Sequence, residues 1–225
     1  PSATVLKYLP KASDGAASSL GLVAFVDPDT DYNGDGQRDY PGLPFAQQEV
    51  ERIAPYFGKR QLLQGGNAIE EKCVRLVRGG QVVHFACHGE FFPSRPMDST
   101  LYLSRGANSD GLLKAVEVFG LDLTRARLVT LSGCETGRLE LGPGDDPVGI
   151  GTALRHSGAR ALVVSLWKVE DEATAELMEK FYAIWLDKKV TDRASALRQA
   201  KLAMIREGRF KRPRQWAAFV LLGRR

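Results

Sequence analysis

The chain has 225 residues, with 31 lysines and arginines against 27 aspartates and glutamates, which gives a formal net charge of +4. Its 44% hydrophobic and 26% charged composition is typical of a globular protein with a sizeable core, and it excludes collagen-like, coiled-coil and wholly disordered chains. The longest apolar runs fall far short of the roughly 18 residues that a membrane-spanning helix needs, which indicates a soluble protein with no membrane partner. No domain boundary stands out, so we expect one domain over residues 1–225.

Strand-like and helix-like segments alternate along the whole chain. Runs rich in valine and leucine, each the length of a buried strand, occupy residues 20–26, 82–86, 127–132, 161–166 and 216–222. Helical patterns fall at residues 46–57, 69–77, 148–156, 172–186 and 193–206. Residues 101–104 and 112–114 flank a turn and are expected to form a small hairpin. This order predicts an α/β fold with a mainly parallel sheet, helices on both faces, and sites at the carboxyl ends of the strands.

Cysteine usage indicates the compartment. The three cysteines, Cys73, Cys87 and Cys134, are odd in number and have no CxxC spacing. Neither a disulfide framework nor a structural zinc site is therefore expected. A reducing, cytoplasmic location is the simplest interpretation.

The carboxyl-terminal part of the chain is strongly basic. Residues 188–225 carry 12 lysines and arginines against Asp192 and Glu207. Such a tail can bind nucleic acid or a membrane surface. The charges alternate, however, with apolar residues spaced as one face of an amphipathic helix, among them Leu197 and Ile205. We therefore favour a solvated helix face and expect no nucleic-acid partner.

Two of the predicted strands are followed by residues that can perform nucleophilic chemistry. His88 lies just past the strand 82–86 and precedes Gly89, and Cys134 lies just past the strand 127–132, after Gly133. Parallel strands end at one edge of a sheet, so the imidazole and the thiol can meet there although 46 positions separate them. The thiolate is the reactive species, and a nearby imidazole can generate it and later protonate a leaving amine. The amides of Gly89 and Cys134 are suitable donors to an oxyanion.

The remaining cysteines and histidines favour structural roles. A lone cysteine is most often a small buried hydrophobe, and Cys73 lies inside a predicted helix. Cys87 adjoins His88, and because adjacent strand residues point to opposite faces, one of the two must look away from a site. His84, four places back in the strand, and His156, near a helix end, are interpreted as structural.

Four motifs in register give the chain a family resemblance. It resembles the CHAT family of caspase-like cysteine peptidases, which are relatives of separase and the caspases. The motifs are His84 to Gly89 (HFACHG), Leu131 to Gly137 (LSGCETG), Ser165 to Asp171 (SLWKVED) and Trp216 to Phe219 (WAAF). They cover most of the chain in order, and they include both residues that the strand argument selects.

The resemblance implies a fold and a mechanism. The fold would be caspase-like, a mainly parallel β-sheet sandwiched between helices on both faces. His88 would be the general base and acid, Cys134 the nucleophile, and the amides of Gly89 and Cys134 the oxyanion hole, with no cofactor required. The resemblance also implies further strands before Pro1, and a carboxyl-terminal position in a longer protein behind a sensor or repeat domain, often tetratricopeptide.

Substrate preference is expected to depend on an acidic side chain. Related peptidases that cut after arginine or lysine carry such a group at the base of the primary pocket, where it pairs the substrate cation. Asp171 is our first candidate, and Asp145 or Asp146 the second. Asp171 is equally placed to be a first-turn acid of the helix that starts near Glu172, and both roles can coexist. We expect cleavage of a protein substrate after a basic residue.

One acidic loop matches the first nine positions of a calcium loop. Its glycine at position six would allow the sharp turn, and its oxygen-bearing side chains have the expected spacing. Position twelve, where a bidentate acid should sit, is Gly42, so the last ligand would have to come from Glu49 or Asp27. A solvated glycine-rich turn has the same composition, so both interpretations stay open. The predicted ligands are Asp31, Asn33, Asp35, Gln37 and Asp39.

Two rival functions can be compared with that of an active peptidase. A catalytically silent module of the same fold, acting in interaction or signalling, is the alternative to an active peptidase, and the intact pair of His88 and Cys134 argues against it. A cysteine phosphatase needs an arginine six positions after its cysteine. That position is Glu140, so this class is excluded.

Overall fold

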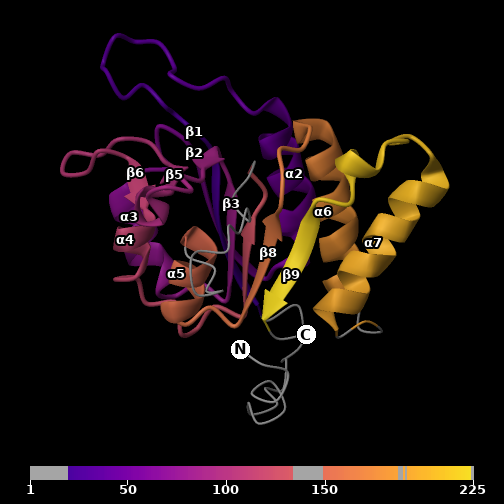
Figure 1. Cartoon of the computed structure of the whole chain (residues 1–225). Coiled ribbons are helices and arrows are strands. Elements are labelled where there is room, and N and C mark those ends of the chain that lie inside the picture. The colour runs from indigo at the N-terminus through magenta and orange to yellow at the C-terminus, as the bar shows by residue number, and fades with distance from the viewer. Residues whose placement is uncertain (1–19, 134–148, 187–189, 191, 224–225) are drawn as a thin grey trace.

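The computed structural model describes residues 20–133, 149–186, 190 and 192–223 of the chain (Figure 1). Six strands form the main sheet in the order β2-β1-β3-β7-β8-β9. Neighbouring strands are parallel except β9, which runs antiparallel to β8. The predicted mainly parallel sheet is therefore confirmed. The strands are β1 (Gly21–Pro28), β2 (Lys59–Gly65), β3 (Val82–Ala86), β7 (Leu128–Leu131), β8 (Ala161–Ser165) and β9 (Phe219–Gly223).

Helices cover both faces of this sheet, as expected for an α/β fold (Figure 1). On one face pack α2 (Pro44–Ile53), α6 (Asp171–Leu186) and α7 (Arg193–Glu207). On the other pack α3 (Glu70–Val77), α4 (Ala115–Val118) and α5 (Ile150–His156). Each face has its own core, because the side chains of a strand alternate between the two layers. In β3, Val82 belongs to the first core and Val83 to the second.

The sequence reasoning missed one strand of the main sheet. β2 pairs with β1 over Lys59 to Gly65 and forms an edge of the sheet. Its first four residues are exposed, and only Leu63 is buried. A polar edge strand lacks the continuous apolar run by which buried strands are recognised. The five strands with such runs were all found, one with its observed boundaries and the others with ends that differ by up to three residues.

A second, three-stranded antiparallel sheet lies beside the first. The hairpin expected near residues 101–104 and 112–114 is confirmed as β5 (Thr100–Tyr102) and β6 (Leu112–Lys114). The added strand is β4 (Gly89–Glu90), which pairs with β5 and begins directly after His88. The chain therefore passes from the end of β3 directly into the small sheet, and pairing with β5 helps to fix the direction of the chain after His88. The chain also contains three short 3-10 helices, η2 (Ala54–Tyr56), η3 (Pro96–Asp98) and η4 (Pro213–Gln215), within the described residues.

The basic carboxyl-terminal region contains the predicted amphipathic helix, α7. Its buried face includes Ala196, Leu197, Ala200 and Met204, whereas Ile205 is 44% exposed, so the apolar stripe is narrower than expected. Asp192 caps the helix by accepting the backbone N–H groups of Ala194 and Ser195. Within the described residues, the longest helices fall short of the length and apolarity needed to cross a membrane.

Candidate active site

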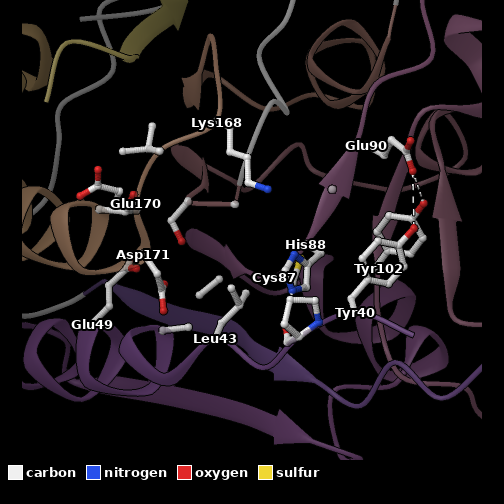
Figure 2. A pocket seen from close by; sticks show the side chains of 18 residues that line it. Tyr40, Leu43, Glu49, Cys87, His88, Glu90, Tyr102, Lys168, Glu170 and Asp171 are labelled. Carbon is white, nitrogen blue, oxygen red and sulfur yellow. Dashed lines mark hydrogen bonds between the residues drawn. The ribbon is translucent and has the colours of Figure 1, made fainter. Parts of the chain in front are cut away.

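A cavity of about 570 Å³ opens at the carboxyl ends of β3, β7 and β8. This is the edge of the sheet where the sequence predicted a site. His88 lies in the middle of the cavity wall, with Glu49, Glu170 and Asp171 on one side and Tyr40, Tyr102 and Glu90 on the other (Figure 2). Lys168 also lines the cavity and is exposed.

His88 is held by a backbone carbonyl. Its Nε2 lies 2.7 Å from the carbonyl oxygen of Pro41. A carbonyl oxygen only accepts, so Nε2 carries the proton in this contact and Nδ1 of the neutral ring is left as the basic nitrogen. The ring of Tyr40 packs against the imidazole, with 5.4 Å between ring centroids, and fixes its plane. His88 is thus arranged as a proton acceptor at Nδ1.

The segment that carries Pro41 is itself anchored. Asp27, at the end of β1, forms a 2.7 Å ion pair with Arg38 and accepts the backbone N–H of Leu43 through the same oxygen, Oδ1. These two contacts hold the chain on both sides of Pro41. The Pro41 carbonyl fixes the tautomer of His88, and its position therefore depends on Asp27, an acid at the end of a neighbouring strand.

The amide of Gly89 faces away from the small sheet. The carbonyl of His88 accepts a 2.9 Å hydrogen bond from the backbone N–H of Tyr102 on β5. The carbonyl and N–H of one trans peptide unit point in opposite directions, and the described residues contain no cis peptide bond. The Gly89 N–H, which belongs to the same peptide unit, therefore points away from β5. Gly89 lines the cavity, as an oxyanion donor must.

Gly133, at the end of β7, is fixed tightly beside the same loop. A Cβ at this position would overlap the carbonyl oxygen of Cys87 and would lie 3.8 Å from the amide nitrogen of Gly89. Its own carbonyl accepts a 2.9 Å hydrogen bond from the hydroxyl of Ser165. Only glycine permits this close approach of two strand ends. Cys134, the next residue in the chain, lies outside the described residues, as do Asp145 and Asp146.

The two described cysteines are buried and unsuited to nucleophilic attack. Cys73 packs in α3, where burial raises the pKa of its thiol well above the ordinary value. Cys87 is 1% exposed within the second core, and burial raises the pKa of its thiol to about 12. Of the neighbours Cys87 and His88, the cysteine side chain is therefore the one that looks into the core. Both thiols stay protonated at neutral pH.

Asp171 begins α6 and lines the cavity. Its Oδ2 accepts a 2.9 Å hydrogen bond from the backbone N–H of Phe45, in the first turn of α2. Burial is the main cause of a raised pKa of this carboxyl, and the nearby carboxylates of Glu49 and Asp27 add to it, against the lowering effect of the Phe45 amide. Asp171 thus lies both in the first turn of α6 and in the cavity wall, as expected.

His84 and His156 lie away from the cavity wall. His84 is fully buried in β3, with Nδ1 3.2 Å from the hydroxyl of Tyr182. His156 ends α5 and packs against the ring of Phe119. The sequence reasoning interpreted both as structural, and their surroundings agree with that interpretation.

The sequence reasoning did not select Glu90, Lys168 or the tyrosines of the cavity wall, and it named Glu49 only as a possible last ligand of the calcium loop. A signal for Glu49 was present. In α2 the buried residues are Ala46, Glu49, Val50 and Ile53, so the acid occupies a position in the apolar stripe of the helix. Tyr40 and Tyr102 gave no comparable signal, because the chain must fold before they meet.

The acidic loop at residues 31–39 is closed by hydrogen bonds within itself. The carboxylate of Asp31 accepts the N–H groups of Gly34 and Gly36, and Asp39 accepts that of Tyr32. Asn33 and Asp35 accept, in the same way, the N–H groups two positions further along. Across the residues that the structure describes, no three His, Cys, Asp or Glu side chains are grouped to hold a metal. The calcium site stays a prediction.

Comparisons with known proteins show the family and the fold of the chain. The family model for the CHAT domain matches residues 1–224. Human tetratricopeptide repeat protein 28 is 24% identical over 214 residues, which cover 80% of this chain and only 8% of that protein. The gingipain R structure, an Arg-specific cysteine proteinase, superposes with a TM-score of 0.65 at 12% identity and covers 92% of this chain and 47% of that one. Separase of Saccharomyces cerevisiae, in complex with securin, gives a TM-score of 0.61 at 13% identity, over 92% of this chain and 12% of that one. The caspase-like fold is thereby confirmed.

Proposed function

The chain belongs to the CHAT domain family, and from that premise we propose that it is a cysteine endopeptidase with His88 and Cys134 as its catalytic pair. One observation carries the proposal. The bond from His88 Nε2 to the Pro41 carbonyl leaves Nδ1 basic, in a cavity whose wall includes the residue directly before Cys134. A proton acceptor beside a thiol is what nucleophilic attack by cysteine requires.

The reaction would proceed in two halves. In the first, Cys134 Sγ attacks the substrate carbonyl carbon while its proton passes to Nδ1 of His88. The N–H groups of Gly89 and Cys134 donate to the oxyanion, the carbon–nitrogen bond breaks, and the proton leaves with the amine. In the second, His88 takes a proton from water, the hydroxide attacks the thioester, and the carbon–sulfur bond breaks. Cys134 then regains its proton and the carboxylic acid product leaves. No cofactor is needed for these steps.

The fixed geometry at Gly133 supports this assignment. Its backbone is confined by Cys87 on one side and held through its carbonyl by Ser165 on the other. The backbone is therefore held in place up to the residue before the proposed nucleophile. Preorganisation of this kind lowers the entropic cost of reaching the attack geometry.

We propose further that the substrate residue before the scissile bond is basic. Asp171 places a half-buried carboxylate in the cavity near His88. Such a group favours a cation over a neutral or acidic side chain, because the cation relieves the unfavourable burial of the carboxylate. Asp146, the second candidate, lies outside the described residues and stays a prediction.

The proposed partners are a protein substrate and a regulatory region outside this domain. The printed name of the human relative includes tetratricopeptide repeats, and this chain spans only 8% of that protein. Separase was solved in complex with securin, a protein partner. A repeat region that presents or restrains the substrate is consistent with both.

The test is hydrolysis of a fluorogenic peptide panel that varies the residue before the scissile bond. The wild type should cut peptides with arginine or lysine at that position, and Cys134→Ala should abolish cutting. Cys73→Ala is the matched control, because it removes a buried thiol that does not line the cavity and should leave turnover intact. Cutting that persists in Cys134→Ala would refute the catalytic pair. A silent panel, together with no labelling of Cys134 by a thiol-reactive probe, would favour an interaction or signalling module.

A further inference from the structure

Glu49 occupies a costly position for an acid. It lies in the apolar stripe of α2 between Ala46 and Val50, and only 1% of its surface is exposed. Carboxylates are almost never buried to this extent without a partner, because loss of hydration penalises the charge. Glu49 nevertheless reaches the wall of the cavity.

The one imidazole beside Glu49 leaves its Oε1 without a hydrogen bond. His84 Nε2 lies 2.7 Å from Glu49 Oε1, a contact that is an ion pair only when the ring is protonated, and Oε1 accepts no hydrogen bond within the described residues. The same nitrogen lies 3.3 Å from the hydroxyl of Ser132. In the part of the chain that the structure describes, no lysine or arginine pairs with Glu49 or Asp171. The cavity thus holds a buried carboxylate oxygen that lacks a donor.

A second carboxylate faces the same space. Asp171 comes from α6, and its Oδ2 is tied to the amino-terminal turn of α2. Glu49 and Asp171 lie on the same side of the cavity, across His88 from Tyr40 and Tyr102 (Figure 2). They are close enough for the charge of Glu49 to raise the pKa of Asp171. Asp27, the third acid nearby, is already paired with Arg38.

We propose that Glu49 is a second specificity-determining carboxylate of this cavity and that it binds, together with Asp171, the guanidinium of a substrate arginine. This inference rests on the proposed peptidase function and deepens it. The orphaned Oε1 would gain a charge-assisted hydrogen bond, and the like charges of the two carboxylates would be neutralised by one cation.

Two carboxylates from different helices favour arginine over lysine. A guanidinium is planar and presents five N–H donors, so it can bridge acceptors that approach from two directions. An ammonium is a compact point charge on an unbranched stem, and it satisfies one carboxylate more readily than two. Burial at Glu49 strengthens the contact further, because a cation that reaches it leaves water. We therefore expect arginine to be preferred to lysine.

The test uses peptides that end, before the scissile bond, in arginine, lysine or citrulline, the neutral isostere of arginine. The ratio of kcat/KM for arginine over citrulline measures the charge contribution alone. Glu49→Gln should lower this ratio by about tenfold or more, with little change in the citrulline rate. Glu51→Gln, the same substitution at an exposed position of the same helix, should leave the ratio unchanged. An unchanged ratio in a folded Glu49→Gln protein would overturn the inference while the peptidase function stands.

A binding measurement separates the inference from the function. In the Cys134→Ala background, calorimetry compares product peptides ending in arginine and in citrulline, with and without Glu49→Gln. Discrimination that depends on Glu49, in a chain whose wild type cuts nothing, would uphold the cation site and refute the peptidase. If Glu49→Gln fails to fold, Glu49→Asp withdraws the carboxylate by one methylene. A folded Glu49→Asp protein should lose preference for arginine over lysine, and an unchanged preference would also overturn the inference.

Discussion

The two histidines of the HFACHG segment lie four residues apart and have opposite fates. His84 sits inside β3, fully buried between Glu49, Tyr182 and Ser132. His88 lies past the end of the strand, in the cavity wall, with one ring nitrogen on the Pro41 carbonyl. The same side chain is thus surrounded by fixed protein groups in one place and opens onto a substrate-sized cavity in the other.

This difference shows what the end of a parallel strand provides. Inside the sheet an imidazole can only complete a polar network, because every neighbour is fixed by packing. At the carboxyl end the strands diverge, loops begin, and an imidazole can exchange protons with a molecule that enters from solvent. Residue type alone does not separate the two roles. Position relative to the strand end does.

Substituting each histidine in turn should produce the largest effects. One substitution should reduce activity and the other should reduce stability. His88→Ala should reduce kcat/KM by about 10³-fold or more, since it removes the proposed general base, and should change stability by less than about 1 kcal/mol. His84→Ala should lower the free energy of unfolding by about 2–5 kcal/mol, because it removes a fully buried side chain, leaves an empty space beside Glu49 and takes the Nδ1 contact from the Tyr182 hydroxyl. Peptide hydrolysis and urea unfolding measure the two quantities.

Either of two results would contradict the different roles of the two histidines. A His88→Ala protein that is fully active, or a His84→Ala protein as stable as the wild type, would show that the position past the strand end does not decide the role. His156→Ala is the control, because this histidine is exposed at the end of α5 and should alter neither quantity by much.

Gly133, just past the end of β7, tests whether the close packing of the strand ends is needed for activity. Gly133→Ala should lower stability by about 1–3 kcal/mol and abolish hydrolysis, because the new methyl group would overlap the Cys87 carbonyl oxygen and push the two strand ends apart. Gly151→Ala is the matched control. Its added methyl would only meet a Leu162 methyl at 3.8 Å, and alanine is the better helix former in α5. Thermal unfolding and hydrolysis of both variants test this, and a tolerant Gly133 would contradict the close packing.

Much of the fold could be predicted from the sequence because its buried strands carry their own signal. Continuous apolar runs marked five of the six strands of the main sheet, whereas the polar edge strand β2 had none. The five longer helices were located by periodicity, with ends shifted by one or a few residues, since packing rather than propensity sets the last turn. The four-residue α4 was missed, because it is too short to show a period. β9 was found as a strand, but its antiparallel direction could not be derived from the local pattern.

The candidate site was predictable only where chemistry and strand ends coincide. His88 and Asp171 both follow apolar strands, and both lie in the cavity. The place of Glu49 in this cavity was missed, and the residue was named only as a possible calcium ligand, because an acid on a helix is usually interpreted as solvated. Pro41 contributes through its backbone, and a backbone acceptor leaves no trace in residue type.

The smallest effect is expected at Asp171. Burial of its carboxylate in the cavity destabilises the fold, and the same carboxylate is proposed to bind a substrate cation. The folded state raises the pKa of this carboxyl above the usual 3.8, chiefly through burial. Between the two pKa values the folded protein therefore binds more protons than the unfolded chain, and stability falls as pH rises through that window. Above it, ionised Asp171 destabilises the fold. Asp171→Asn keeps an acceptor for the Phe45 N–H but removes the charge.

The Tm of Asp171→Asn, minus that of the wild type, should be near zero below pH 3.8 and positive by a small margin at neutral pH, while hydrolysis after arginine falls. Asp171→Ala shows what losing the Phe45 contact costs, because it removes charge and acceptor together. The groups that share this titration are Glu49, Asp27 and His88, and they are common to the wild type and both variants. An Asn variant less stable than the wild type at neutral pH would mean that Asp171 is ionised without penalty. Its place in the cavity would then be that of an ordinary first-turn acid of α6, with no burial energy for a substrate cation to recover.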